Sequence, residues 1–201
     1  MRYPLSFQLN WMGFEEFLSY CRGNPVDPLL RLILASDGSM THMLSALILH
    51  PIDLEAPRHE ETQAGAEIAG YLGIEADQKV ITRDVWLRHG GQKLLYAHSI
   101  IPVTQSGKDF WEEIIQKNRP IGYFFGEQGL LTLRDRLSIG MVRCEEMAKD
   151  LDLQSDQTFW ARRYRLTVKE KLTAIILEVF SPALFNRRDF LDIGVYSHIE
   201  K

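Results

Sequence analysis

The sequence is poor in cysteine, lacks long apolar segments and carries no excess of basic residues. Its two cysteines, Cys21 and Cys144, form neither a C-x-x-C pair nor a disulfide framework. No run of about 18 or more apolar residues occurs, so the sequence holds no candidate membrane span. The segment Met1-Arg2-Tyr3-Pro4-Leu5-Ser6 also lacks the apolar core of a signal peptide. We therefore expect a protein of a reducing compartment, with the cytoplasm as its location.

The charge balance excludes a large electropositive surface. Lysine and arginine number 23 and aspartate and glutamate 27, which gives a net charge of −4 and an isoelectric point of about 5.9. Such a balance does not favour binding to nucleic acid or to an anionic membrane. We predict neither as a partner. If the ligand is an anion, a local group of positive charges must hold it.

The motifs of several common enzyme classes are missing. The sequence has no G-x-G-x-x-G, no G-x-x-x-x-G-K-[ST] and no G-x-S-x-G, so dinucleotide-binding, P-loop and α/β-hydrolase functions lack support. Its six histidines form neither H-E-x-x-H nor a close cluster, and we predict no metal site. Arg162, Arg163 and Arg165 lie close together, but on an alternating strand they divide between two faces and make no nucleic-acid patch.

What remains is the composition of an ordinary globular domain. Hydrophobic residues make up 45% and charged residues 25% of a chain of 201 residues. We divide it into an N-terminal appendage at 1–25, with a helix around 14–21, a main domain at 26–185 and a C-terminal tail at 186–201. In the main domain, Asp27 is a suitable cap for a helix that begins at Pro28, and Ser39 a suitable cap for a second one.

The middle of the chain changes to the period of a β-strand. Residues 79–89 and 92–103 alternate on either side of Gly90-Gly91, which predicts a hairpin with a tight turn. Residues 158–168 and 172–181 predict a second hairpin, and 130–142 one more strand. Strands joined by tight turns favour an antiparallel sheet with helices packed on it, in the α+β class.

The other segments are a helix and two less regular stretches. A helix is predicted at 107–117, and the charged stretch 145–156 is predicted as a solvated surface loop. Residues 51–73 show no clear pattern.

Three charged residues occupy apolar rows of the predicted strands. Arg83 alternates with Ile81 and Val85, and Glu178 and Arg162 hold equivalent positions in the second hairpin. Burying an ion costs several kcal/mol unless it is paired. One explanation is structural: Arg83 and Glu178 pair with each other, or each reaches solvent at a strand end. The other is a buried cavity in which Arg83 grips a carboxylate and Glu178 accepts a hydrogen bond from a ligand hydroxyl.

Six short segments, in order over residues 27–185, form a pattern shared with a known family. They are Asp27-Pro28-Leu29-Leu30, Ser39-Met40-Thr41, Arg83 with the strand that ends at Ile101-Pro102-Val103, Arg119-Pro120-Ile121-Gly122, residues 160–166 (WARRYRL) and residues 176–182 (ILEVFSP). With these segments the chain resembles the chorismate lyases (chorismate pyruvate-lyases), including their cyanobacterial and chloroplast-type relatives.

The resemblance implies a fold and a reaction. The fold would be an antiparallel sheet of about six strands with helices packed on it and an enclosed ligand cavity. The reaction would convert chorismate to 4-hydroxybenzoate and pyruvate without a cofactor, for ubiquinone or plastoquinone biosynthesis. Arg83 would hold the ring carboxylate and Glu178 would contact the 4-oxygen, so these two are the expected catalytic residues. Met40 and Ile121 would contact the ligand through their main chain, and we expect Arg162 to help bind the second carboxylate.

Two alternatives stay open at this point. The same fold serves as the ligand-binding domain of some transcription regulators, so the chain could bind an aromatic acid without turning it over. It could also be a cofactor-free enzyme that acts on a related cyclohexadiene acid. The sequence indicates no oligomeric state.

Overall fold

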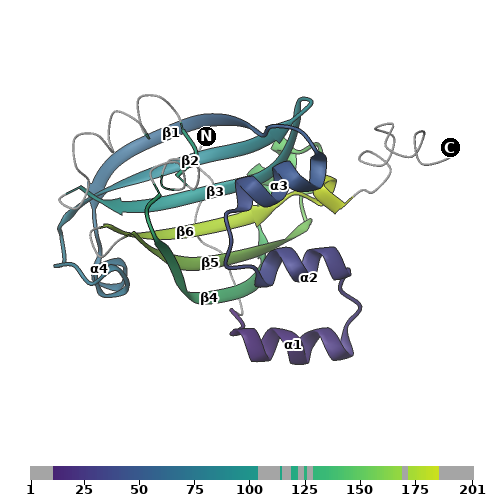
Figure 1. Cartoon of the computed structure of the whole chain (residues 1–201), viewed down its shortest axis with the longest axis horizontal. Helices are drawn as coiled ribbons and strands as arrows, with labels where there is room; N and C mark the ends of the chain where they lie inside the picture. Colours follow the sequence, from purple (N-terminus) through teal and green to yellow (C-terminus); the bar gives the residue numbers. More distant parts are fainter. Residues whose placement is uncertain are drawn as a thin grey trace, which may run out of the picture.

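The computed structural model describes residues 11–103, 114, 119–121, 125, 129–168 and 172–185. Six antiparallel strands form one sheet in the order β1-β2-β3-β6-β5-β4, shown in Figure 1. This is the α+β architecture that the tight turns between strands predicted. The predicted helix at 107–117 falls, except for Ile114, outside the described residues, as do residues 1–10 and the tail at 186–201.

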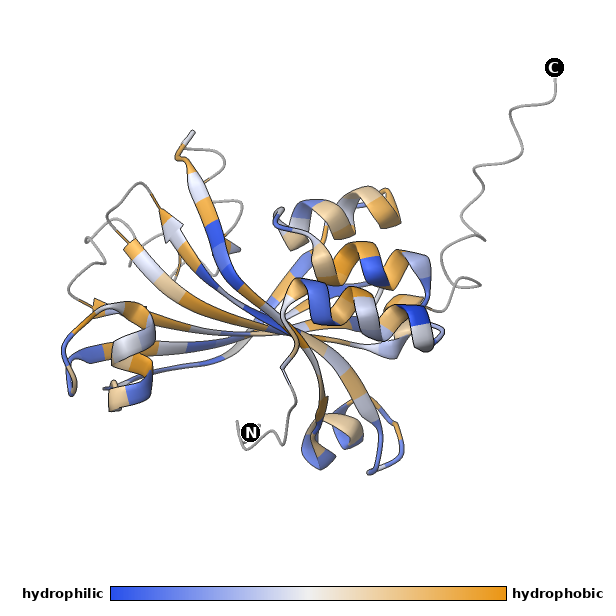
Figure 2. Ribbon diagram, turned by 90° about the horizontal axis from the view of Figure 1, so that it is seen from below, coloured by the Kyte–Doolittle hydropathy of each residue, from blue (hydrophilic) through white to orange (hydrophobic). Residues whose placement is uncertain are grey.

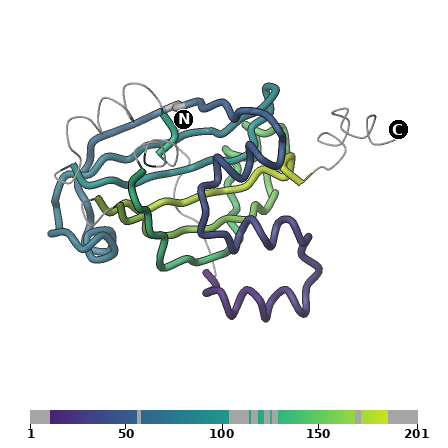
Figure 3. The backbone as a smooth tube through the Cα atoms, in the orientation of Figure 1, coloured from purple at the N-terminus to yellow at the C-terminus, as the bar shows by residue number. Residues whose placement is uncertain are grey.

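Both predicted hairpins are confirmed and form the centre of the sheet. β2 (Lys79–His89) pairs with β3 (Gln92–Pro102), and β5 (Thr158–Val168) pairs with β6 (Leu172–Phe180). Gly90 and Gly91 have φ angles of 56° and 85°, the left-handed conformation that a two-residue hairpin turn requires. The two hairpins join through β3 and β6, which lie side by side in the backbone trace of Figure 3.

The edge strands are β1 (Asp53–Gln63) and β4 (Thr132–Arg143). β1 lies in the stretch that showed no clear sequence pattern, and the reason is its edge position. Edge strands carry charged residues and proline, which remove the alternation that marks a central strand. Its pairing with β2 is also shifted between Glu55 and Arg58. The short helix α4 (Ala66–Leu72) follows β1.

Three helices cover one face of the sheet, which we call the inner face and define by Arg83 and Glu178. They are α1 (Phe14–Gly23), α2 (Pro28–Ala35) and α3 (Met40–Ile48), and Figure 2 shows them together on one side. The predicted cap of α2 is present, because the Asp27 side chain accepts a hydrogen bond of 2.7 Å from the backbone N–H of Leu29. The described part of the N-terminal appendage therefore packs on the domain, through α1.

The inner face carries two apolar clusters with a gap between them. One joins the first three helices to the sheet through residues such as Phe17, Leu44 and Phe180. The other surrounds Ile114 and Phe125 at the opposite end of the strands. Because the two clusters fill the ends of this face, the space between them remains for a cavity.

The opposite, outer face is covered by two short helices. α4 packs on Val80 and Ile100, and α7 (Glu145–Asp150) packs on a second cluster that includes Trp86. The prediction of a solvated loop at 145–156 is wrong for the helix α7. Its acidic first turn is exposed, but Met147 on its other side is completely buried. Helices therefore lie on both faces of the sheet.

Candidate functional site

Strand register brings the lone charges of the sequence to one region of the inner face. Arg83 on β2 stands opposite Ser99 on β3, and Glu178 on β6 stands opposite Ala97, two residues further along β3. One strand separates β2 from β6. With strands about 4.8 Å apart and about 3.3 Å per residue, the Cα atoms of Arg83 and Glu178 are about 12 Å apart. No ion pair joins the two side chains in the described part of the chain, and Glu178 pairs with Arg162 instead.

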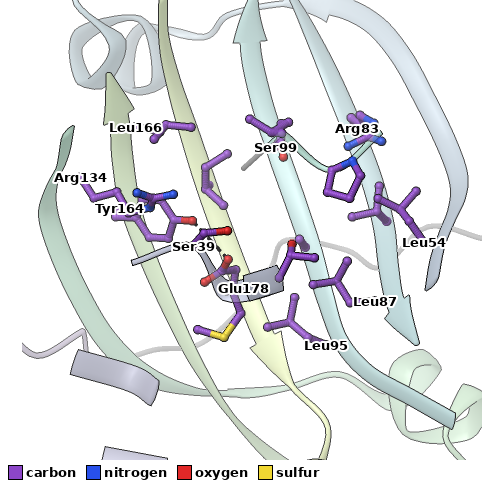
Figure 4. A pocket seen from close by; sticks show the side chains of 17 residues that line it. Ser39, Leu54, Arg83, Leu87, Leu95, Ser99, Arg134, Tyr164, Leu166 and Glu178 are labelled. Carbon is purple, nitrogen blue, oxygen red and sulfur yellow. Dashed lines mark hydrogen bonds between the residues drawn. The ribbon is translucent and has the colours of Figure 1, made fainter. Parts of the chain in front are cut away.

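A cavity fills this space. The empty volume of this cavity, together with the solvent at its mouth, is about 530 Å³. Four of the five predicted site residues line it: Met40, Arg83, Ile121 and Glu178. They come from α3, β2, β6 and the segment at 119–121, so elements far apart in sequence meet here. Figure 4 shows Arg83 and Glu178 on different sides of the cavity.

Arg83 is a buried cation without a carboxylate partner in the described part of the chain. Its residue is 2% exposed, and its guanidinium Nη2 donates one hydrogen bond, 3.2 Å long, to the backbone oxygen of Arg119. Burial lowers its pKa to about 10, so it remains charged at neutral pH. A cation held in this way is suited to bind the carboxylate of a ligand.

Glu178 is fixed from two sides. Its Oε2 accepts a 2.5 Å hydrogen bond from Arg162 Nε, and its Oε1 accepts one of 3.2 Å from the hydroxyl of Tyr164. Burial raises the pKa of Tyr164 well above its ordinary value, so the phenol keeps its proton and acts as the donor. The carboxylate therefore presents fixed acceptor atoms to the cavity.

Arg162 lies behind Glu178 and is not among the residues that line the cavity. It is completely buried, and its Nη1 donates to the backbone oxygens of Ile33 and Ser36, at 2.8 and 2.6 Å. Burial lowers the pKa of Arg162, but the interactions with Glu178 and Tyr164 together outweigh burial, and the net direction is upward. Its Nη2 is buried without a hydrogen-bond partner among the described residues, but because Arg162 does not line the cavity, no contact supports its predicted role in binding a second carboxylate. It orients Glu178 instead.

This geometry decides between the two explanations of the lone charges. Arg83 and Glu178 do not pair with each other, and both are buried rather than extended to solvent. The structural explanation is correct in one respect that the sequence did not show, because Glu178 is paired with Arg162, its direct neighbour across β5 and β6. Arg83 is buried and has no carboxylate partner among the described residues.

Three further residues of the cavity were not predicted as site residues. Tyr164 and Arg134 line it, and the guanidinium of Arg134 lies 5.8 Å from the centre of the Tyr164 ring. Ser39 lines it as well; its side chain makes no cap for α3, and its hydroxyl oxygen is buried without a hydrogen-bond partner. The only sequence signal for these positions was the nearness of Ser39 and Tyr164 to predicted site residues.

The outer face holds a separate polar group. Asp84 accepts a 2.5 Å hydrogen bond from the hydroxyl of Tyr96 and lies 2.7 Å from Nδ1 of His98. Among the described residues, no group of three histidine, cysteine or acidic side chains is arranged to hold a metal ion. In the same residues, no helix has the length and apolar character needed to cross a membrane.

Comparison with known families gives this arrangement a context. A sequence model of the Rv2949c-like chorismate pyruvate-lyase family matches residues 34–188, which include all of the predicted site residues. The chain belongs to this family. The resemblance based on six short segments is thereby confirmed. A search of curated proteins found no match.

The solved structures that resemble the chain in fold include several transcription regulators. PhnF from Mycobacterium smegmatis superposes with a TM-score of 0.63 at 12% identity, covering 74% of this chain and 66% of that one. The ligand-binding domain of a GntR-family regulator from Bordetella bronchiseptica gives 0.55 at 17% identity, covering 65% and 86%. A GntR-family regulator from Bacillus cereus gives 0.53 at 13% identity, covering 66% and 92%. Identities this low establish the shared fold alone.

Proposed function

We propose that this member of the chorismate pyruvate-lyase family is an active chorismate lyase, which converts chorismate to 4-hydroxybenzoate and pyruvate. The observation that supports the proposal most is the pair formed by Arg83 and Glu178 across one cavity. The buried Arg83 guanidinium, which has no carboxylate partner in the described part of the chain, suits the ring carboxylate, and a fixed carboxylate suits the ring hydroxyl. In this proposal the protein acts in the cytoplasm and supplies 4-hydroxybenzoate for quinone biosynthesis.

The reaction asks for positioning more than for strong acid or base catalysis. The ether bond between the ring and the enolpyruvyl group breaks, and its electron pair leaves with the enolpyruvyl oxygen. The ring loses a proton from the carbon that bears the hydroxyl and becomes aromatic, and the released enolpyruvate takes up a proton to become pyruvate. Arg83 fixes the carboxylate end of the ring, and Glu178 fixes the hydroxyl and stabilises the positive charge that develops beside it.

The test follows both products from one substrate. Purified protein is incubated with chorismate, and pyruvate and 4-hydroxybenzoate are measured in the same samples. The proposal expects equimolar release at a rate well above the spontaneous decay of chorismate. Release of neither product above that background contradicts it.

The role of Glu178 needs a control because it belongs to a buried ion pair. Glu178→Gln leaves Arg162 uncompensated, which costs about 3–5 kcal/mol for a buried pair. The double variant Arg162→Met/Glu178→Gln removes both charges and is expected to recover most of this stability. If Glu178 acts on the substrate, the double variant stays inactive although it is folded. Recovery of activity together with stability assigns Glu178 a structural role.

The second candidate is a sensor that binds an aromatic acid without turnover. It is favoured by the fold shared with the ligand-binding domain of the Bordetella bronchiseptica regulator. The two candidates differ in one result. Tight binding of 4-hydroxybenzoate by a protein that releases no pyruvate from chorismate supports the sensor and excludes the lyase.

A further inference from the structure

A second positive group lines the cavity on the side opposite Arg83. Arg134 on β4 is four strands away from Arg83 in the sheet order, and Figure 4 shows it beside Tyr164, across the cavity from Arg83. No carboxylate in the described part of the chain pairs with Arg134. Its Nη1 donates to the backbone oxygen of Asp37 and to Thr132 Oγ1, at 3.2 and 3.3 Å, whereas its Nε is buried without a hydrogen-bond partner.

The hydroxyl of Ser39 is a second unsatisfied group on this side. Ser39 lines the same cavity, its hydroxyl oxygen is buried, and no atom of the described residues hydrogen-bonds to it. Buried donors left without a partner are uncommon, since each costs free energy that an unpaired group cannot recover. Two residues with such atoms, Ser39 just before α3 and Arg134 on β4, line one cavity, which indicates that a ligand completes their hydrogen bonds.

The charges of the site agree with this. Arg83, Arg134 and Arg162 contribute three positive charges and Glu178 one negative charge, so the cavity and the groups behind it carry a net charge of +2. A ligand with one carboxylate neutralises only half of this excess. A ligand with two carboxylates neutralises it completely.

We infer that Arg134 and Ser39 form a second carboxylate subsite, and that the cavity selects a dianionic ligand in which a ring carboxylate meets Arg83 and a second, ether-linked carboxylate meets Arg134. The inference rests on the proposed function for the placement of the ring. It replaces Arg162 by Arg134 as the residue for the second carboxylate. It also gives the site a preference for substrate over product, because 4-hydroxybenzoate keeps only the first carboxylate.

The experiment compares binding of two stable aromatic acids that differ in the second carboxylate. The probes are 4-hydroxybenzoate and 3-(carboxymethoxy)-4-hydroxybenzoate, and their affinities are measured by titration calorimetry. The wild-type protein is expected to bind the dicarboxylate at least tenfold more tightly. Arg134→Gln is expected to lower the affinity for the dicarboxylate by about 10- to 100-fold and the affinity for 4-hydroxybenzoate by less than twofold. Arg143→Gln, an exposed position on the same strand, is the matched control and is expected to change neither.

Because Arg134 also holds the backbone of Asp37, a second variant avoids that contact. Ser39→Ala removes a hydroxyl that makes no protein hydrogen bond, and it is expected to weaken only the dicarboxylate, by about 3- to 10-fold. Equal affinity of the wild type for both acids overturns the inference, as does an equal loss for both acids in either variant. Pyruvate release from chorismate is followed separately. Selective binding of the dicarboxylate without pyruvate release supports the carboxylate subsite and contradicts the proposed lyase activity. Pyruvate release without selective binding supports the lyase activity and contradicts the subsite.

Discussion

Replacing Arg83 by methionine is expected to stabilise the free protein and to abolish binding of aromatic acids. The guanidinium is buried, with no counter-ion among the residues that the structure describes, and the lowering of its pKa from the ordinary value to about 10 corresponds to a cost on the order of 3 kcal/mol at neutral pH. The variant also loses the hydrogen bond to the backbone of Arg119, worth about 1 kcal/mol. The expected net gain is about 2 kcal/mol, or a rise in Tm of about 4–8 °C for a chain of this size.

The assay is thermal unfolding with and without 4-hydroxybenzoate. Arg83→Met is expected to show a higher Tm than the wild type without ligand and no further rise with it, whereas ligand raises the Tm of a protein that binds it. Arg31→Met, at an exposed position on α2, is the control and is expected to leave both values within the error of a surface substitution. A lower Tm in Arg83→Met, or an unchanged response to ligand, refutes the reasoning that Arg83 is kept for a ligand.

Three further predictions concern other parts of the molecule. Asp27→Ala, which removes the cap of α2, is expected to lower the free energy of unfolding by about 1 kcal/mol in urea titrations. Asp84→Asn is expected to cost about 1–3 kcal/mol at pH 7. Burial raises the pKa of Asp84, but its hydrogen bonds with His98 and Tyr96 outweigh burial and lower the pKa. The ionised Asp84 therefore stabilises the fold above the pKa that it has in the unfolded chain. The difference in stability between wild type and variant should vanish as the pH falls below about 4. Tyr164→Phe is expected to lower kcat about tenfold and the free energy of unfolding by about 1–3 kcal/mol, since it leaves the buried Oε1 of Glu178 without this donor. An unchanged kcat in the folded variant would show that this hydrogen bond does not position the glutamate.

Local patterns predicted the elements whose signal lies within one segment. The alternation of residues 79–103 and the Gly90-Gly91 turn predicted the first hairpin with nearly the observed ends, and Asp27 with Pro28 predicted the start of α2. The same alternation identified Arg83 and Glu178, because a single charge in an apolar row stands out. Whether they line one cavity remained open, since the order β2-β3-β6 is a property of non-local pairing.

The rest depended on contacts that no segment contains. The partner of Glu178 is set by the pairing of β5 with β6, which makes Arg162 its direct neighbour. Arg134 was missed because the pairing of β4 with β5 shifts between Asp135 and Ser138, and such a bulge changes which residues of the strand face inward. Arg134 and Ile139 therefore both reach the inner face although they are five positions apart, an odd number that would place them on opposite faces of a regular strand. Helix α7 was not predicted, because most of its residues are charged and only Met147 and Ala148 are buried.

The most direct test of the account is a crystal structure of the protein with 4-hydroxybenzoate. The account predicts one molecule between β2 and β6, with its carboxylate on the guanidinium of Arg83 and its hydroxyl on the carboxylate of Glu178. A ligand bound in the opposite orientation, or bound elsewhere while this cavity stays empty at saturating concentration, contradicts the account.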